Sequence, residues 1–291
     1  MRKKTSRAVR VRLALAFALA LAGLATGAAA AAPLRVMTFN VRVPVDTGPR
    51  AWEARRDLMA RTIAEADPDV LGTQELVPRQ AADLLARLHA WAWVGRGRDG
   101  GQGGMEEHMG LFFRRDRLQL LDSGDFWLSA TPDVPGSISW GHPYPRMVTW
   151  ARFRRRADGA TFTLFDTHLP YREQDEDARL RGARLILQRL AQLPADEPFV
   201  LTGDFNTTPA SPVHAALTAV LADAWLTAPR RQGPELTFHD FTGKPDRRLD
   251  WILFRGLRLL EARTLDTHQG DVWPSDHFPV LATFELPAPA R

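Results

Sequence analysis

Polar residues end several apolar, strand-like runs in this 291-residue chain. In LTGDFNTTP, residues 201–209, Asp204 and Asn206 would point to one side of an extended strand while Phe205 points to the other. Polar groups recur at similar places as Asn40, Glu75, Asp166 with His168, Asp250, and Asp276 with His277. Because buried carboxylates and amides are unfavourable unless paired, hydrogen-bonded or metal-bound, this recurrence favours one shared site.

Each of these residues also has a structural interpretation. Asn40 could fix a turn, and Asp276 could cap the strand that follows it. Asp250 could pair with Arg247 or Arg248, which lie just before it in the sequence. The joint placement of the polar residues favours the shared site over these separate explanations.

The residue types indicate a particular chemistry. Carboxylate and amide oxygens suit a hard cation such as Mg²⁺ or Mn²⁺. The chain has no Cys, which excludes disulfides, Cys-ligated zinc and a thiol nucleophile. Two imidazoles beside the cation would accept and donate protons near neutral pH. The combination is typical of metal-assisted hydrolysis of a phosphate ester, in which a base activates the attacking water.

The N-terminus has the pattern of an export signal. Residues 1–12 carry six Lys or Arg and no acid, and an apolar, then Ala-rich run follows to residue 32. We therefore expect residues 1–32 to be a cleaved signal peptide and the mature chain, 33–291, to be periplasmic or extracellular. An uncleaved anchor is the alternative, because residues 13–32 are almost wholly apolar.

Loss of that segment changes the charge balance. The chain has 38 Lys and Arg against 34 Asp and Glu, and six of the cations lie in residues 1–32, which leaves 32 against 34, a net charge of −2. A duplex-binding nuclease needs a basic stripe along the DNA backbone, so phosphate recognition here must be local. The whole chain has 45% hydrophobic residues and nine Trp, and residues 33–291 are expected to form one catalytic domain and to act as a monomer without a protein partner.

Strand and helix patterns are mixed along the mature chain. Apolar strand segments are expected at 34–42, 69–75, 108–114, 147–153, 161–169, 199–206, 249–254 and 278–286. Helical patterns are expected at 52–66, 78–89, 175–193 and 211–224, the last with Ser211 as its N-cap. Several strands are apolar on both faces, which predicts an α/β protein whose sheets are covered on both sides.

The motif series MTFN, GTQE, DTHL, TGDFN, RRLDWIL and SDHFPV resembles the endonuclease/exonuclease/phosphatase superfamily, which has the deoxyribonuclease I-like fold. The resemblance covers residues 34–286, and GDFN followed by SDH is its most specific part. It implies a four-layer α/β sandwich of two packed mixed β-sheets flanked by helices, with the active site at one end. It also implies an Mg²⁺- or Mn²⁺-dependent enzyme with a phosphate-ester substrate.

The resemblance assigns the metal and the base to particular residues. Glu75 is the principal metal ligand by similarity, and Asn40 holds the metal or the substrate phosphate. Asp276 adds a further carboxylate. His277 is the general base, and Asp250 fixes its tautomer and stabilises the cation that forms.

The remaining catalytic roles also follow from similarity. Asp204 and Asn206 would orient the attacking water and the phosphate. His168 would stabilise the phosphoryl oxygens or assist the leaving group. Nucleases of the family pair this second histidine with a glutamate on an earlier strand, which corresponds to Glu107, with Glu106 as the alternative.

The resemblance is looser around the substrate. Family members commonly carry Asn at the position of Asp166, so an additional negative charge either lies near the phosphate or is turned away. Arg146 and Arg172 are candidate phosphate contacts, although surface roles are an equal alternative. Tyr144 and Tyr171, the two tyrosines of the chain, lie next to these arginines in the sequence. A ring such as Tyr171 in this position could stack on a base or sugar.

These observations predict an exported, divalent-metal-dependent phosphoesterase that hydrolyses a mono- or diester by in-line attack of water. A secreted nuclease acting on DNA or RNA is the alternative, and a non-catalytic binding protein on the same scaffold is the third possibility. An open groove would favour the nuclease, and a closed pocket would favour a small substrate.

Overall fold

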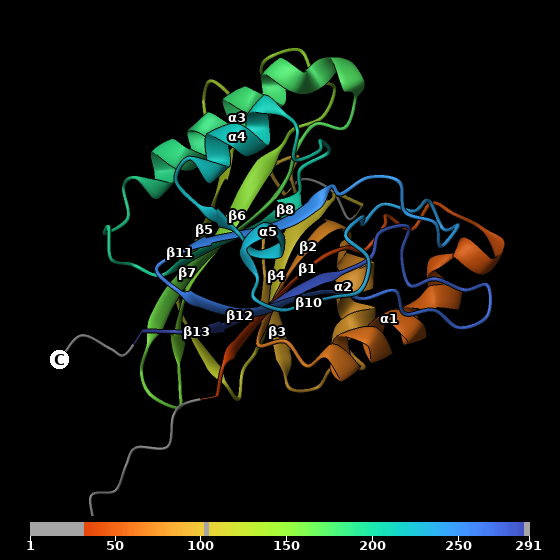
Figure 1. The fold of residues 1–291 in the computed structure, drawn as a ribbon. Helices are drawn as coiled ribbons and strands as arrows, with labels where there is room; N and C mark the ends of the chain where they lie inside the picture. Colours follow the sequence, from red (N-terminus) through yellow and green to blue (C-terminus); the bar gives the residue numbers. More distant parts are fainter. Residues whose placement is uncertain (1–31, 102–104, 288–291) are drawn as a thin grey trace, which may run out of the picture. The chain divides into compact units, whose positions relative to one another are not determined.

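Two mixed β-sheets pack face to face in the computed structural model, which describes residues 32–101 and 105–287 (Figure 1). One sheet has the strand order β10-β12-β13-β1-β2-β4-β3, and the other has the order β5-β6-β7-β8-β11-β9. Each sheet contains one central parallel pair, β1 with β2 and β7 with β8. The other pairings are antiparallel except at the short edge strand β10, where pairing with β12 is parallel.

The strands are short and mostly buried. The seven-stranded sheet contains β1 (Leu34–Asn40), β2 (Val70–Leu76), β3 (Trp91–Val94), β4 (His108–Arg114), β10 (Arg231–Gln232), β12 (Arg258–Thr264) and β13 (Val280–Glu285). The six-stranded sheet contains β5 (Leu118–Trp127), β6 (Met147–Arg155), β7 (Thr161–His168), β8 (Phe199–Asp204), β9 (Ala222–Asp223) and β11 (Asp250–Arg255). Every strand expected from the sequence is present.

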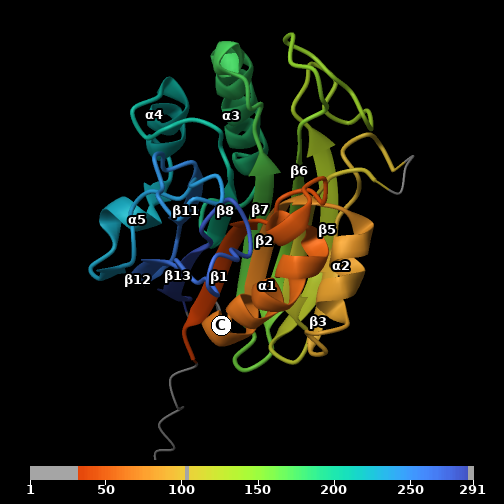
Figure 2. The same ribbon diagram turned by 90° about the vertical axis from the view of Figure 1, so that its right-hand side faces the viewer.

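Helices cover the outer faces of both sheets (Figure 2). The elements are α1 (Trp52–Ala66) and α2 (Pro78–Leu85) on the seven-stranded sheet, α3 (Glu176–Leu190) and α4 (Pro212–Thr218) on the six-stranded sheet, a short α5 (Ala224–Thr227), and 3₁₀ turns at Gly48–Arg50 and Glu173–Asp175. One apolar core fills the space between the sheets, and two more lie under the helices. Three cores separate four layers, so the predicted fold class is confirmed.

The sequence patterns missed the strands that are half exposed. β5 is an edge strand with polar residues such as Asp122 and Ser123 on its exposed positions, and β12 is largely half-buried. Neither contains an apolar run, because one face of each does not enter a core. The helix expected at 211–224 ends at Thr218, although Ser211 caps it as predicted by accepting a hydrogen bond from the His214 amide at 3.2 Å.

The strand pairing brings polar residues that are distant in sequence to one end of the sandwich. In the six-stranded sheet His168 is opposite Asp204, and Asp250 is opposite Asp204 from the other side. β11 runs antiparallel to β8, so the first residue of β11 meets the last residue of β8. In the other sheet Asn40, the last residue of β1, is paired with Gln74. The register therefore brings these strand ends together, and the loop between β12 and β13 adds Asp276 and His277.

The proposed signal peptide lies almost entirely outside the described residues, which begin at residue 32. Within the part of the chain that the structure describes, no helix has both the length and the apolar character that a bilayer span requires.

Candidate active site

A cavity of about 570 Å³ opens where the polar strand ends meet. Most of the residues expected at the site line it: Glu75, Glu107, Arg146, His168, Tyr171, Asp204, Asn206, Asp276 and His277. Other residues complete the wall: Arg42, Val43, Arg98, Tyr144, Phe238, Arg247 and Leu249. Asn40 and Asp250 are buried behind this lining, and both hydrogen-bond to residues in it.

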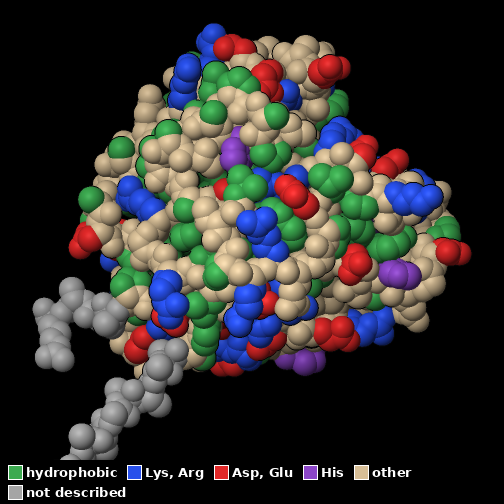
Figure 3. Space-filling model, in the orientation of Figure 1, with side chains coloured by type: hydrophobic (Ala, Val, Ile, Leu, Met, Phe, Trp, Pro, Cys, Tyr) green, Lys and Arg blue, Asp and Glu red, His purple; other side chains and the backbone are tan. Residues whose placement is uncertain are grey.

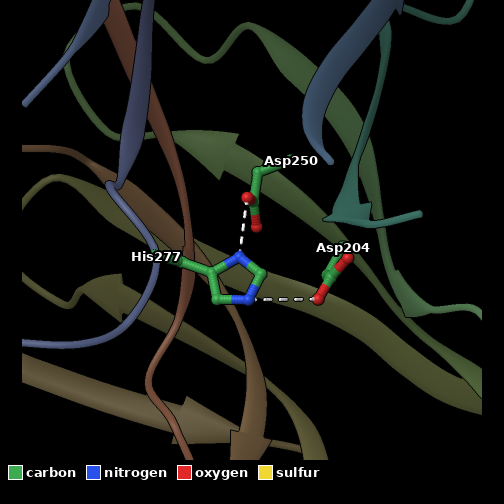
Figure 4. A group of neighbouring side chains, drawn as sticks. All are labelled: Asp204, Asp250 and His277. Carbon is green, nitrogen blue, oxygen red and sulfur yellow. Dashed lines mark hydrogen bonds and ion pairs between the residues drawn. The ribbon is translucent and has the colours of Figure 1, made fainter. Parts of the chain in front are cut away.

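His277 is held by a buried carboxylate (Figure 4). Its Nδ1 lies 2.8 Å from Asp250 Oδ2, and Asp250 is 2% exposed. Arg248 does not pair with Asp250, because its guanidinium forms two hydrogen bonds to Asp223 instead. The hydrogen bond to Asp250 places the proton of a neutral His277 on Nδ1 and leaves Nε2 facing the cavity as a proton acceptor.

Asp204 lies between the two histidines. Its Oδ2 is 3.7 Å from His277 Nε2 and 3.5 Å from His168 Nε2. Its Oδ1 accepts a hydrogen bond from the Asn206 amide at 2.9 Å. Asn206 has a left-handed backbone with φ of 51°, and its side-chain amide donates to the Leu169 carbonyl. The sharp turn after β8 thus directs Asp204 and Asn206 into one cavity, as their spacing predicted.

Glu75 is oriented by an irregular strand end. The β2–β4 pairing shifts register between Thr73 and Leu76, and Glu75 has φ of 60°. Its Oε1 accepts from Asn40 Nδ2 at 3.1 Å, and its Oε2 accepts from the Val43 amide at 2.9 Å. Bulges and left-handed backbone in residues other than glycine cluster at functional sites, where they aim a side chain.

Asn40 makes hydrogen bonds to three of its neighbours. Its Nδ2 also donates to Asp204 Oδ2 at 3.0 Å, and its Oδ1 accepts from the Arg42 amide at 3.0 Å. The carboxylates of Glu75 and Asp204 accept hydrogen bonds, so they face the NH₂ group of Asn40. The backbone N–H of Arg42 donates, so it faces the Asn40 oxygen. These contacts determine the orientation of the Asn40 side chain. Asn40 therefore bridges Glu75 and Asp204, and its oxygen keeps a second lone pair, so its role toward the metal or the substrate phosphate stays a prediction.

The donor set fits a hard divalent cation at Glu75 and Asp276. Burial raises the pKa of Asp276, and repulsion from Glu75 adds to the increase, while His277 and Arg42 oppose it. Asp276 is buried and Glu75 is half-buried, and a bound cation would offset the repulsion between their carboxylates. Asp204, Asp250 and His277 also offer ligand atoms within 4.8 Å of one another. In that group the short contact between Asp250 and His277 is a hydrogen bond, so Glu75 and Asp276 remain the predicted ligands of the cation.

The charges around His277 favour its protonated form. Burial lowers the pKa of His277, but the carboxylates of Asp250, Asp204 and Asp276 outweigh burial and raise it to about 10. Burial raises the pKa of Asp204 to about 7, with His277 opposing that shift. Positive charge placed at Asp276 would weaken the field that holds the proton on His277. Cation binding and base function are therefore coupled at this site.

Arg146 presents an unused donor to the cavity. The residue is 3% exposed, and among the described residues its Nη1 has no hydrogen-bond partner. Burial, together with repulsion from Arg98, lowers the pKa of Arg146 to about 10, so the side chain stays charged at neutral pH. A buried guanidinium with a free N–H suits a phosphate oxygen. This geometry agrees with the predicted phosphate contact.

Glu107 lies in the cavity, but its partner is not the predicted one. Its Oε2 accepts a hydrogen bond from Arg98 Nη1 at 2.6 Å. His168 Nδ1 is buried without a hydrogen-bond partner in the described part of the chain, so the expected Glu107–His168 pair is absent there. The Glu107 carboxylate pairs with the charged Arg98 guanidinium instead of with His168. Glu106 is buried outside the cavity lining, where its Oε2 accepts from the Gly101 amide.

His168 is kept neutral by its surroundings. Burial lowers its pKa well below the ordinary value, and the positive charges of Arg146 and Arg98 add to the effect. A neutral imidazole can still donate one hydrogen bond to a phosphate oxygen.

Two residues are turned away from the cavity. Arg172 lies outside the lining, because its guanidinium forms two hydrogen bonds to Asp175 and one to the Gly141 carbonyl. This position corrects the prediction that Arg172 contacts the phosphate. Asp166 is fully buried between the sheets, where its Oδ1 accepts from Gln74 and Thr202 at 2.7 Å. Its burial raises its pKa well above the ordinary range, so it adds little negative charge to the site.

Sequence reasoning overlooked Arg42, Phe238 and Arg247. Arg42 comes two residues after the end of MTFN and lies 3.6 Å from Asp276. Phe238 packs edge-on against the His277 ring at a centroid distance of 5.0 Å, and the Arg247 guanidinium lies over the Phe238 ring. The adjacency of Arg42 to a motif was a usable signal, whereas the stretch around Phe238 has no pattern that distinguishes it from a surface loop.

Comparison with known proteins agrees with this architecture. The sequence model of the Endonuclease/Exonuclease/phosphatase family matches residues 37–277. The chain belongs to this family, whose members are hydrolases of phosphoester bonds.

Several solved structures share the fold over nearly their whole length. An endonuclease/exonuclease/phosphatase from Bacteroides vulgatus is 33% identical, with a TM-score of 0.81 over 88% of this chain and 100% of that one. A mannosyl-6-phosphatase from Bacteroides thetaiotaomicron is 29% identical, with a TM-score of 0.79 over 86% of this chain and 99% of that one. Nocturnin from Drosophila melanogaster is 24% identical over 82% of this chain and 43% of the relative. The chain spans only 43–59% of the length of the first three curated relatives.

Proposed function

We propose that this protein is a divalent-metal-dependent phosphoesterase with His277 as its general base. The observation that supports the proposal most is the convergence of His277, held by Asp250, with Asp204 and Arg146 in one cavity. A base, a carboxylate that orients water and a cationic phosphate contact are the groups that phosphoryl hydrolysis requires.

In the proposed reaction, the water oxygen forms a bond to phosphorus while the opposite bond, from phosphorus to the alcohol oxygen, breaks. His277 accepts the water proton at Nε2, and Asp250 stabilises the imidazolium through Nδ1. Asp204, 3.7 Å from the same nitrogen, orients the water. Arg146 and neutral His168 donate hydrogen bonds to the phosphoryl oxygens, where negative charge increases. The leaving oxygen departs as an alkoxide and takes a proton from solvent water, which gives the free alcohol.

Glu75 and Asp276 would hold the Mg²⁺ or Mn²⁺ ion, with Asn40 fixing the orientation of Glu75. When bound, the cation neutralises charge on the phosphorus oxygens. It also offsets the repulsion between these two carboxylates.

Two observations favour a phosphate monoester or small diester over a nucleic acid. The solved mannosyl-6-phosphatase is similar over 86% of this chain. On the face shown in Figure 3, Lys and Arg side chains are interspersed with Asp and Glu, without the basic stripe that a duplex would follow. A nuclease remains the competing function within the same family.

The targeting and assembly predictions complete this proposal. Residues 1–32 act as a cleaved signal peptide, residues 33–291 form the single catalytic domain, and the enzyme works as an exported monomer. N-terminal sequencing of the protein recovered outside the cytoplasm tests the cleavage, and light scattering tests the oligomeric state.

The test of the activity combines a metal series with two histidine variants. The purified protein is assayed with Mg²⁺, Mn²⁺ or a chelator against sugar phosphates, a generic phosphodiester, phospholipids, and single- and double-stranded nucleic acid. His277→Gln should abolish turnover and keep the fold. His214→Gln is the matched control, because His214 forms a similar 2.8 Å pair with Asp223 outside the cavity. Undiminished turnover by His277→Gln would refute the proposed mechanism, and preferred cleavage of nucleic acid would establish the nuclease.

A further inference from the structure

The two tyrosines of the chain meet at the mouth of the cavity. Tyr144 and Tyr171 both line it, and their rings lie nearly parallel, with centroids 6.5 Å apart and an angle of 27° between planes. They are 45% and 54% exposed. Two large rings that remain this exposed beside a deep polar site offer apolar surface to a ligand.

Hydrogen bonds outside the cavity lining support the platform formed by Tyr144 and Tyr171. Arg172, which follows Tyr171, donates a hydrogen bond to the Gly141 carbonyl and thereby ties together the two segments that carry the rings. His142 contacts the Tyr144 carbonyl through Nδ1 at 2.6 Å. These contacts restrain the two segments that carry the rings, which reduces the entropy lost on binding.

Polar groups adjoin the platform on the cavity side. The Arg98 guanidinium lies over the Tyr144 ring, 4.9 Å from its centroid, and also binds one oxygen of Glu107. Among the described residues, the other Glu107 oxygen makes no hydrogen bond, so it can accept one from a ligand hydroxyl. An aromatic surface beside a carboxylate and a guanidinium suits a ring that has apolar faces and hydroxyl groups at its edges.

The charges argue against additional phosphates in this part of the cavity. Arg98 is paired with Glu107, and Arg42 is paired with Asp46 through two hydrogen bonds. Arg247 is paired with Asp246, so Arg146 is the cation in the described lining without a carboxylate partner, and its Nη1 is an unused donor. One phosphate can be bound at this position, whereas a polynucleotide would need several unpaired cations along its path.

We infer that the platform and Glu107 form a subsite for the sugar ring of a monosaccharide phosphate. This inference rests on the proposed function, because the phosphate of the same molecule must lie at Arg146. The pyranose ring packs a face on the tyrosines, and a hydroxyl donates to Glu107. The subsite makes the enzyme selective for the alcohol part of its substrate, a property that the metal and base do not determine.

The experiment compares substrates that share the phosphate and differ in the ring. Steady-state KM and kcat are measured with mannose 6-phosphate, glucose 6-phosphate, the acyclic glycerol 1-phosphate, adenosine 5′-monophosphate and a single-stranded oligonucleotide. The variants are Tyr171→Ala, Tyr144→Ala and Tyr171→Phe, with Ile138→Ala as the control, since Ile138 is an exposed apolar side chain outside the cavity lining.

We expect Tyr171→Ala to raise KM for the hexose phosphates about tenfold relative to glycerol 1-phosphate, the change that a lost stacking contact produces. Tyr171→Phe should restore most of the preference, because it keeps the ring. Equal losses with ring and acyclic substrates would overturn the inference while leaving the phosphoesterase intact. Preference for the nucleotide or oligonucleotide would also overturn it. Absence of turnover with every ester would remove the proposed function and this inference together.

Discussion

Replacing Asp250 by Asn gives the sharpest test of the proposed catalytic pair. The change keeps the shape of the side chain and removes one negative charge from the group that lies 2.8 Å from His277 Nδ1. A hydrogen bond to a charged group contributes about 1.5–3 kcal/mol, equivalent to about 10–150-fold in rate. An amide that directs its NH₂ group at Nδ1 also enforces the wrong tautomer, a fault that lowers kcat by about 10⁴ in the Ser-His-Asp triad. We expect a loss in kcat of about 10²–10⁴ with little change in KM.

The assay is steady-state kinetics at saturating substrate and Mg²⁺ or Mn²⁺, with circular dichroism to verify folding. Asp223→Asn is the matched control, because Asp223 forms the same 2.8 Å contact with His214 but lies outside the cavity. It should lose about 3–5 kcal/mol of unfolding free energy, since Arg248 would be left buried without its partner, while kcat per folded molecule stays near the wild-type value. A folded Asp250→Asn enzyme with wild-type kcat would refute the reasoning.

Three further predictions concern packing, pH and metal. Gly72→Ala should lower the unfolding free energy in urea by about 1–3 kcal/mol, because its methyl group would meet the Asp166 carboxylate and the Thr202 hydroxyl between the sheets; unchanged stability would contradict this packing. Burial tends to raise the pKa of Asp223, but its partners outweigh burial and lower the pKa below its ordinary value. The stability that this carboxylate contributes is therefore present at neutral pH and is lost as pH falls through the lowered pKa. Asp223→Asn should consequently flatten the acid side of a plot of unfolding free energy against pH. Chelation should abolish turnover, and calorimetry should show weaker Mg²⁺ or Mn²⁺ binding by about 10–100-fold in Glu75→Gln, whereas wild-type affinity in that variant would place the cation elsewhere.

The candidate site shows how far reasoning from residues extends. The spacing predicted that Asp204 and Asn206 face the same way, and the cavity contains both, although β8 ends at Asp204 and a left-handed turn at Asn206 replaces the expected strand alternation. Hydrogen-bond partners were harder to anticipate. Glu107 was expected beside His168, but the structure pairs it with Arg98, nine residues earlier in a glycine-containing loop with no periodic pattern.

In the fold, too, some strands were predictable from the sequence and others were not. Strands with both faces buried were recognisable as apolar runs, since every position along them avoids water. The edge strand β5 and the half-exposed β12 were not, because solvent permits polar residues on one face. Whether a strand lies at an edge depends on which neighbours it finds, and this information is spread over the whole chain.

The sequence by itself supplied the candidate reacting groups: carboxylates, an amide and imidazoles at strand ends, a set that favours acid–base hydrolysis with a hard cation. Only the tertiary structure decided their environments. It buried Arg146 with a free N–H, turned Asp166 into the space between the sheets, and brought Tyr144 within ring contact of Tyr171. Local patterns specify what a side chain can do, whereas burial and partner choice depend on contacts between residues that are far apart in the sequence.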